Sequence, residues 1–358
     1  MSNYIEYNDK MVFHPGYYIK EIIEDIGITQ EDFAKRLDTT PKNLSLLIRG
    51  EQSLSIDIAM KLSRMMDTSI IYWLNLQKIF DAAIAESMSE KMLFEEREVF
   101  KVLNYKYFCD YFKLPELVGE LDDQIGMVRS FLRVSSLTVL KSDNLSVCFR
   151  NEKNDLSVED KIKANAMVQI ATNTALNEET PKYNKKRFEE AVDYALNYTG
   201  NHSDFFKILK SEFLKAGVIL VAVPNLSNSK TNGATKKLGE KIMLMINERG
   251  ESNDSIWFTL LHEIGHIMNG DFGISLEQDK GEKEKIANEY ARNKLIPNDL
   301  YSEYLKHSNF SEKSILSFAQ NVNRDPGIIV GRLQHDGLVS KDNAKLNALK
   351  RKYIISLI

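Results

Sequence analysis

Short amphipathic segments fill the first 80 residues of the chain. Over residues 17–26, apolar positions recur three and four residues apart and Gly27 follows, which predicts a helix that ends at the glycine. Four later segments each follow a hydroxyl side chain that can cap a helix: Thr29, Thr40, Ser55 and Ser69. Pro41 suits the first position of the helix after Thr40, and we expect the last two helices to end at Met66 and Phe80.

The pattern changes twice after residue 80. Residues 81–203 are helical in texture and contain no motif, so we expect a helical connector that can also form a dimer interface. From 204, a helix closed by Gly217 precedes the apolar run VILVAVP, an aperiodic loop over 225–240 and the strand-like run KIMLMIN. This order predicts a small α+β unit over 204–300, followed by a helical segment over 301–358 that packs on it. The chain is therefore expected to be mainly α, with an α+β C-terminal part.

The second and third predicted helices form a helix-turn-helix pattern inside a domain that we place at 13–80. In this geometry, the first turns of the second helix of the pair enter the major groove of DNA. Side chains that can bind DNA there are Thr39, Thr40, Lys42, Asn43, Ser45 and, near the helix end, Arg49. Four basic residues and one acid, Asp38, fall between positions 35 and 49, which makes a local basic patch. A helical dimerisation or docking module would share this composition.

A second motif lies in the stretch WFTLLHEIGHIMNG at 257–270. His262 and His266 stand four residues apart in a predicted helix, so both imidazoles project from one face and can bind one Zn²⁺. Glu263 lies beside them, where its carboxylate can take a proton from an attacking water. The alternative is an amphipathic helix with two surface histidines. However, the chain has six histidines in all, and these two stand among apolar residues in mid-helix.

A zinc peptidase requires a third protein ligand and an open position for water. Glu282, Glu284 and Glu289 are candidates in a predicted helix that ends before Pro297. We choose Glu284, because Asn288 follows one turn later on the same face, where its amide can orient a histidine ligand. We also place the run KIMLMIN, by its position alone, where it can pair with an extended substrate peptide.

His335 ends another predicted helix, over 326–335, which Asp325 caps and Gly337 closes. Its imidazole could reach the active site and stabilise the oxyanion of a tetrahedral intermediate. The simpler interpretation is a histidine that interacts with the dipole at the C-terminal end of its helix. We retain His335 as a candidate catalytic residue.

The composition of the chain indicates which compartment the protein occupies and which partners it can bind. The chain has 358 residues, 43% of them hydrophobic and 27% charged, and a formal net charge of −4, so any contact with DNA must come from a local patch. Cys109 and Cys148 are far apart and lack metal-ligand spacing, which favours free thiols in a reducing compartment. No apolar run is long enough for a membrane span, and the start of the chain lacks a secretory pattern. We therefore expect a cytoplasmic protein without a membrane partner.

The N-terminal part resembles the HigA branch of the XRE-type DNA-binding family. The shared features are His14-Pro15-Gly16, Thr29-Gln30 at the start of the second helix, Arg49-Gly50 after the third, and Trp73-Leu74-Asn75-Leu76-Gln77. The resemblance implies a lambda-repressor-like helix-turn-helix domain that binds operator DNA. It also implies that Gln30 contacts a backbone phosphate and that the stretch from Thr40 to Ser45 faces the bases.

Residues 204–297 resemble the ImmA/IrrE family of zinc metallopeptidases. The motifs are HEIGH at 262–266 and EKIANEYA at 284–291, followed by Leu295-Ile296-Pro297. The resemblance implies a gluzincin-like domain, in which a glutamate ligand precedes an Asp or Asn by one turn. Glu284 and Asn288 have this spacing, whereas Ile286 replaces a second glutamate of the family pattern. The stretch PGIIVGRLQHDG at 326–337 is similar to the end of HigA-type proteins fused to this peptidase domain.

These features together predict a DNA-binding regulator with a zinc-dependent endopeptidase domain. Its substrate would be a regulatory protein in a toxin–antitoxin, mobile-element or stress-response circuit, and a homodimer is expected because such regulators bind paired half-sites. The alternative is a HigA-like antitoxin or regulator without enzyme activity, whose peptidase-like domain senses metal or docks a toxin. Glu263 favours the enzyme, because a metal sensor does not require that carboxylate.

Overall fold

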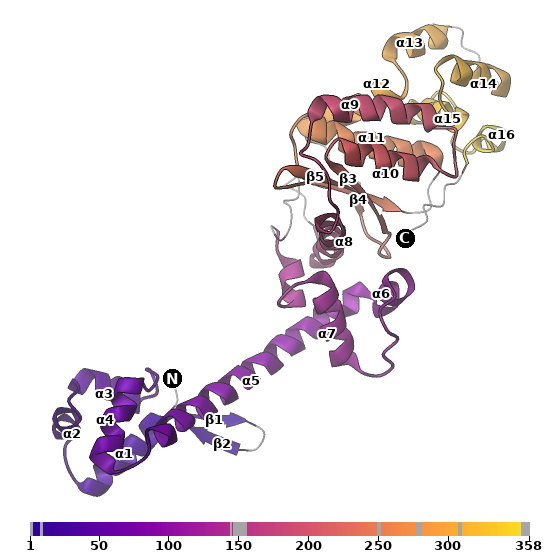
Figure 1. Cartoon of the computed structure of the whole chain (residues 1–358). Helices are drawn as coiled ribbons and strands as arrows, with labels where there is room; N and C mark the ends of the chain where they lie inside the picture. Colours follow the sequence, from indigo (N-terminus) through magenta and orange to yellow (C-terminus); the bar gives the residue numbers. More distant parts are fainter. Residues whose placement is uncertain are drawn as a thin grey trace. The chain divides into compact units, whose positions relative to one another are not determined.

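The computed structural model describes residues 3–7, 10–143, 145, 156–248, 252–276, 281–306 and 310–351. The chain divides into two compact units, Met1–Glu95 and Glu96–Ile358. Both are mainly helical, and a four-stranded sheet lies in the second unit (Figure 1). The prediction of a mainly α chain with an α+β C-terminal part is confirmed. The predicted boundaries at 80, 203 and 300 stay predictions.

The first unit begins with the antiparallel pair β1 (Tyr4–Tyr7) and β2 (Lys10–Phe13), followed by short helices. The helices are α1 (Pro15–Ile26), α2 (Gln30–Arg36), α3 (Pro41–Ile48) and α4 (Ile56–Met66). Thr29, Thr40 and Ser55 cap the last three as predicted, each accepting a hydrogen bond from a backbone N–H three residues on. Local capping chemistry therefore fixes where these helices begin.

The start of α1 is built into the core of this unit. The Nδ1 atom of buried His14 accepts a hydrogen bond from the Gly16 N–H at 3.0 Å and caps the helix. A Cβ atom at Gly16 would overlap the backbone carbonyl of Leu47, so only glycine lets α1 approach α3 this closely. The shared core consists of Ile19, Ile23, Phe33, Ala34, Leu37, Leu44, Leu47, Leu54, Ile58, Ala59, Leu62 and Trp73.

The predicted end of the fifth helix is wrong, because helix α5 is much longer. It spans Ile70–Leu103 and does not end at Phe80. The stretch contains neither glycine nor proline, so nothing in the local sequence stops the helix after its first turns. Residues 81–103 of the predicted connector are therefore the continuation of this helix.

The second unit begins with the end of α5 and continues through helices that precede the sheet. These are α6 (Tyr105–Phe112), α7 (Leu121–Leu132), the 3-10 helix η1 (Leu137–Lys141), α8 (Val158–Leu176), α9 (Lys185–Ala195), the 3-10 helix η2 (Leu196–Tyr198) and α10 (Phe205–Lys215). Helix α9 shares one hydrophobic core with α10 and with the histidine helix. Residues from 185 onward thus belong to the packed body of this unit. Cys109 is a free, half-buried thiol, and Cys148 lies outside the described residues.

The sheet has the strand order β3-β5-β4-β6, with β3 and β5 parallel and the other pairs antiparallel. Its strands are β3 (Val218–Pro224), β4 (Thr231–Leu238), β5 (Lys241–Glu248) and β6 (Gly273–Leu276). Strand β4 lies in the stretch that the sequence predicted as a loop. Its polar residues lack a clear alternation, and pairing with β5 and β6 on both sides makes it a strand.

Strand β5, the run KIMLMIN, lies between β3 and β4, and both of its backbone edges are paired. The expectation that it pairs with a substrate peptide is therefore wrong, since strand addition requires an open edge. Helices α10 and α11 cover one face of the sheet, with α9 packed on α10, and α8 covers the other face (Figure 1).

The remaining helices are α11 (Asn253–Met268), α12 (Glu282–Leu295), α13 (Asn298–Lys306), α14 (Glu312–Asn321), α15 (Pro326–His335) and α16 (Ala344–Asn347). The predicted helix over 326–335 is confirmed: Asp325 caps it, and Gly337 has a φ of 73°. Helix α15 packs against α11 and α14 within the main core. None of the described helices combines the length and apolar character needed to cross a membrane.

Candidate metal centre and nucleic-acid interface

Helix α11 carries both histidines of the HEIGH motif into the interior of the second unit. Ile256, Leu260, Ile264 and Ile267 pack in the main core, which fixes the rotation of the helix. His262 and His266 then face the neighbouring helix α12, and they are 8% and 1% exposed. The alternative of two surface histidines is therefore excluded, because both imidazoles are buried.

Helix α12 runs antiparallel to α11 at short range. A Cβ atom at Gly265 would stand 3.1 Å from the Cα of Ala287, so a larger residue would push the two helices slightly apart. This approach brings the buried Glu284 carboxylate to the histidines: Oε2 lies 3.0 Å from His262 Nε2, and Oε1 lies 3.3 Å from His266 Nε2. The two Nε2 atoms are themselves 3.1 Å apart.

The other candidate glutamates lie away from this cluster. Glu282 and Glu289 are exposed on α12, and the Glu282 carboxylate contacts Lys285. Ile286, which replaces a glutamate of the family pattern, is 44% exposed and points away from the histidines' buried surroundings. Of the described histidines, cysteines and acids, His262, His266 and Glu284 are the group whose ligand atoms all lie within 4.8 Å of one another.

Each histidine is held by a hydrogen bond at its other ring nitrogen. His262 Nδ1 lies 3.0 Å from Asn288 Oδ1, the partner that the sequence predicted. His266 Nδ1 lies 3.0 Å from Asp271 Oδ2, which the sequence analysis missed. When both Nδ1 atoms donate to these oxygens, both Nε2 atoms keep their lone pairs for a metal. The sequence feature that could have indicated this contact is the position of Asp271, five residues after His266 and directly after Gly270.

These residues fit a zinc ion. Two imidazole nitrogens and one carboxylate are the ligand set of catalytic zinc sites. Ligand atoms about 2.0–2.1 Å from a tetrahedral zinc stand roughly 3.3 Å from one another. The two Nε2 atoms stand 3.1 Å apart, close to that value, and each of them lies 3.0 or 3.3 Å from one of the two Glu284 oxygens. Three protein ligands also leave a fourth position open.

The charge state of Glu284 suits this role. Burial disfavours its ionised form, but the neighbouring His262 and His266 imidazoles outweigh burial and hold the pKa of Glu284 well below its usual range. The carboxylate is therefore ionised at neutral pH. A negative charge in a buried site adds to the attraction for a divalent cation.

Glu263 is completely buried and lies against the sheet. A Cβ atom at Gly233 of β4 would meet its Oε1 at 2.7 Å, so the carboxylate rests on the backbone of that strand. Gly233 lies at an irregularity in the pairing of β4 with β6. The glycine leaves room for a carboxylate next to the histidine pair, and this contact was not visible in the sequence.

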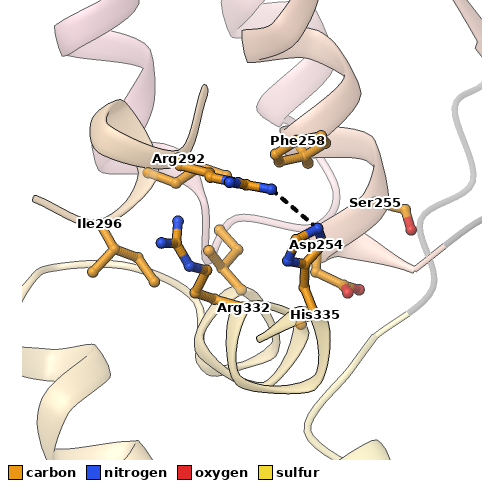
Figure 2. A pocket seen from close by; sticks show the side chains of 10 residues that line it. Asp254, Ser255, Phe258, Arg292, Ile296, Arg332 and His335 are labelled. Carbon is orange, nitrogen blue, oxygen red and sulfur yellow. Dashed lines mark hydrogen bonds between the residues drawn. The ribbon is translucent and has the colours of Figure 1, made fainter. Parts of the chain in front are cut away.

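His335 lies on a different helix from the histidine pair. It ends α15 and lines a pocket together with Phe258 and Arg292 (Figure 2). The Phe258 and His262 rings are 6.3 Å apart, so the pocket adjoins the site. His335 Nε2 lies 3.1 Å from the Arg292 guanidinium, and Nδ1 lies 3.2 Å from Asp336. It is not one of the three clustered ligands, and its role in stabilising an oxyanion stays a prediction.

The first unit presents the residues predicted to bind DNA around the start of α3. Thr40 caps the helix, and Asn43 donates a hydrogen bond to Thr39 at 3.1 Å, so these side chains are held in place. Lys42 is exposed, whereas Gln30 and Ser45 are half-buried. An open hollow beside α3 is lined by Lys35, Asp38, Thr39, Thr40, Lys42, Asn43, Leu46, Ser55, Asp57, Ile58 and Lys61.

Two basic side chains near this surface are already paired with acids. The Arg49 guanidinium makes two hydrogen bonds of 2.9 Å to Glu51. Lys61 lies 3.1 Å from Asp38 and 3.0 Å from Asp57. The predicted basic patch is thus partly neutralised, and Lys42 is its exposed cation at the start of α3.

Comparison with known proteins shows which family the helix-turn-helix segment of the first unit belongs to. Residues 19–73 match the family model described as helix-turn-helix. An HTH-type transcriptional regulator of Escherichia coli, YddM, is 34% identical over 79 residues, which cover 22% of this chain and 84% of that protein. The chain belongs to the helix-turn-helix family. Its N-terminal domain is of the XRE type, and its relatives include transcriptional regulators.

Other relatives match the same helix-turn-helix domain. Virulence-associated protein A′ of Dichelobacter nodosus is 36% identical over 81 residues, which cover 22% of this chain and 70% of that protein. The crystal structure of Pseudomonas aeruginosa PA4674 in complex with its operator DNA matches with 27% identity and a TM-score of 0.22, over 22% of this chain and 89% of that chain. The matched family segment contains all seven predicted DNA-binding residues and ends well before the metal centre.

Proposed function

We propose that the chain is a transcriptional regulator whose helix-turn-helix domain binds operator DNA. The family and the regulators among its relatives support this proposal. Thr39, Thr40, Lys42, Asn43 and Ser45 lie at the start of α3, the position that enters the major groove in this fold. The test is selection of bound fragments from genomic DNA, followed by binding measurements at two salt concentrations.

Paired variants separate the two kinds of DNA contact. Lys42→Ala should weaken binding to all sequences and lower the salt dependence, because a lysine binds phosphate as a point charge. Asn43→Ala should instead relax the preference at one base position. If neither variant alters binding to the selected DNA, α3 is not the recognition helix.

We further propose that the second unit hydrolyses a peptide bond with the help of zinc. The observation that carries this proposal is the buried cluster of His262, His266 and Glu284, with both Nδ1 atoms anchored. Zinc bound there would polarise the scissile carbonyl and make a water acidic enough to attack at neutral pH. Asn288 and Asp271 would keep both rings oriented, and the ionised Glu284 would offset the positive charge.

Glu263 is the residue we assign to proton transfer. It follows His262 directly and has its carboxylate fixed against Gly233, on the wall of the same buried region. Its carboxylate would accept a proton from the attacking water and then donate it to the leaving amine. The substrate we propose is a regulatory protein, in keeping with a helix-turn-helix regulator on the same chain.

A non-enzymatic regulator is the second candidate. The complete burial of Glu263 and the 1% exposure of His266 favour it, because water and a peptide must reach a catalytic site. In this alternative the cluster binds zinc and alters the affinity for DNA or for a toxin, without hydrolysis. Both functions need His262 and Glu284, and hydrolysis alone needs Glu263.

The first experiment measures zinc in the purified full chain and three variants. His262→Ala and Glu284→Ala should lose the zinc that the wild type holds, and Glu282→Ala, which alters an exposed glutamate of the same helix, should keep it. Zinc retained by Glu284→Ala would move the third ligand elsewhere. A wild type that holds no zinc after supplementation would remove the basis of both candidates.

The second experiment compares new protein N-termini in cells that express the wild type or Glu263→Gln. Cleavage products present with the wild type and absent with Glu263→Gln identify the substrate. If both cell populations yield the same products while zinc is bound equally, the enzyme is ruled out and the metal-dependent regulator remains. We also propose a homodimer, and the mass of the full chain measured by light scattering tests it.

A further inference from the structure

A cavity of about 190 Å³ lies between α11, α12 and α15, next to the metal centre. We call it the arginine pocket, because Arg292 and Arg332 line it together with His335. Phe258, Ile296 and Ile328 form its apolar walls. Figure 2 shows the Arg292 side chain lying across the pocket toward His335, with Arg332 rising from α15. The pocket therefore combines apolar walls with two cations.

Arg292 is the cation in this pocket that lacks a counter-charge. Its polar contact is the Nε2 atom of His335, at 3.1 Å, and no carboxylate of the described residues lies within ion-pairing distance of it. Arg332, by contrast, pairs with Asp336 at 2.8 Å and lies over the Tyr301 ring. The acid that lines the pocket, Asp254, is bound by Lys350 at 2.6 Å. A half-buried guanidinium without an acid partner among the described residues can bind an anion, and its planar fork fits a carboxylate.

The pocket has a fixed relation to the metal cluster. Phe258 precedes His262 by one turn of α11, and Arg292 follows Asn288 by one turn of α12. Because the two helices are antiparallel, both steps lead in the same direction, away from Glu284. One turn advances about 5–6 Å, which is the length of roughly two residues of an extended peptide.

We propose that the arginine pocket is a substrate subsite that binds a carboxylate about two residues from the scissile bond. The inference rests on the proposed peptidase function and adds a substrate class to it. The carboxylate belongs to an acidic side chain or to the C-terminus of the substrate. Arg292 binds it, His335 orients the Arg292 guanidinium, and Phe258 packs against the aliphatic part of the ligand.

The test uses ring resonances of the histidines in the full chain labelled with ¹³C-histidine. The probes are the capped amino acids Ac-Glu-NH₂, Ac-Gln-NH₂ and Ac-Leu-OH, which present an acidic side chain, its neutral counterpart and a C-terminal carboxylate. His335→Gln assigns the resonance of His335. We expect this resonance to shift with Ac-Glu-NH₂ or Ac-Leu-OH at millimolar concentration, and binding roughly tenfold weaker for Ac-Gln-NH₂. The stronger of the two acids identifies the source of the carboxylate.

Two variants of Arg292 and a matched control complete the test. Arg292→Gln should abolish the preference for an acid, and Arg292→Lys should retain part of it. Arg187→Gln, an exposed arginine on α9, should behave as the wild type. The proposal is overturned if Ac-Glu-NH₂ and Ac-Gln-NH₂ shift His335 equally, if no probe shifts it, or if Arg292→Gln keeps the preference.

This readout is independent of catalysis. If the probes with a carboxylate bind at the pocket but the chain cleaves no protein, the subsite is supported and the peptidase function is contradicted. In the opposite case, the chain cleaves substrates that have no acidic residue or C-terminus near the cut, and none of the probes binds. That result would support the peptidase function and contradict the subsite. The two failures are therefore distinguishable.

Discussion

Glu263 of α11 lies against Gly233 of β4, close enough that a Cβ atom on the glycine would stand 2.7 Å from the carboxylate. A helix motif is thus completed by a strand residue that lies thirty positions earlier in the sequence. The contact makes the backbone of β4 part of the wall that holds the proposed base.

Gly233→Ala tests this contact. The added methyl group must displace the Glu263 carboxylate, so cleavage of the substrate should fall at least about tenfold, while zinc content stays unchanged because no ligand is touched. Zinc analysis and initial cleavage rates measure both effects. Gly126→Ala is the control for substitution of a glycine, because a Cβ atom at this helical position would meet the end of the Arg129 side chain at 4.0 Å without overlap. Full activity in Gly233→Ala would show that the carboxylate does not depend on this contact.

Asp271 is expected to tune the affinity of the metal site. Its Oδ2 atom holds His266 Nδ1 and its Oδ1 atom holds Lys283, so Asp271→Ala frees the ring and removes a negative charge. Zinc affinity should fall about 10–100-fold, as for other carboxylates that orient a histidine ligand. Competition with a chromogenic chelator measures it, and Asp299→Ala on α13 is the control. Equal affinities would contradict the assigned role.

His14 predicts a pH dependence in the first unit. Burial lowers the pKa of His14 and outweighs the opposing effects of Asp81 and Gln77. The unfolded chain, with a histidine pKa near 6.5, therefore binds more protons than the folded chain once the pH falls below that value. Stability is fully present above about pH 6.5 and is lost as the pH falls toward the lowered pKa of the folded state.

Urea unfolding followed by Trp73 fluorescence, in a Trp257→Phe background, measures this loss between pH 7.5 and 5.5. His14→Asn should flatten the profile, because asparagine can still cap α1 but does not titrate. A profile with the same slope in both proteins would assign the pH dependence to other groups.

Glu51 is expected to weaken DNA binding by occupying Arg49. Both side chains are exposed, and two hydrogen bonds of 2.9 Å to Glu51, with a third to Ser45, occupy the guanidinium. Glu51→Gln should tighten DNA binding by roughly two- to fivefold and make its salt dependence steeper, since one more cation can reach a phosphate. Fluorescence anisotropy at several salt concentrations measures it. Glu24→Gln, which breaks an exposed pair with Lys20 on α1, should have no effect.

The sequence predicted those parts of the molecule that depend on local chemistry. The hydroxyl caps at Thr29, Thr40 and Ser55, the helix over 326–335 and the histidine pair all follow from spacing within a few residues. Asn288 was found for the same reason, because it stands one turn after Glu284 on the same face.

The features that the sequence missed depend on contacts between distant segments. Strand β4 exists because β5 and β6 pair with it, and no periodicity in its own residues indicates this. The Asp271 contact depends on how the chain turns after α11, and the Gly233 contact depends on how the sheet meets the helix. The length of α5 was missed because a predicted end was placed where no residue stops a helix.

The close crossing of α11 and α12 at Gly265 has a further consequence. Two of the proposed ligands lie on α11 and the third on α12, so an ion bound by all three would hold the two helices together. Any ligand that binds only the folded form raises the folded population by mass action. The survival of this unit in a cell that degrades unfolded chains would then follow the supply of zinc, and a chelator would shorten the lifetime of the protein before it affected any reaction.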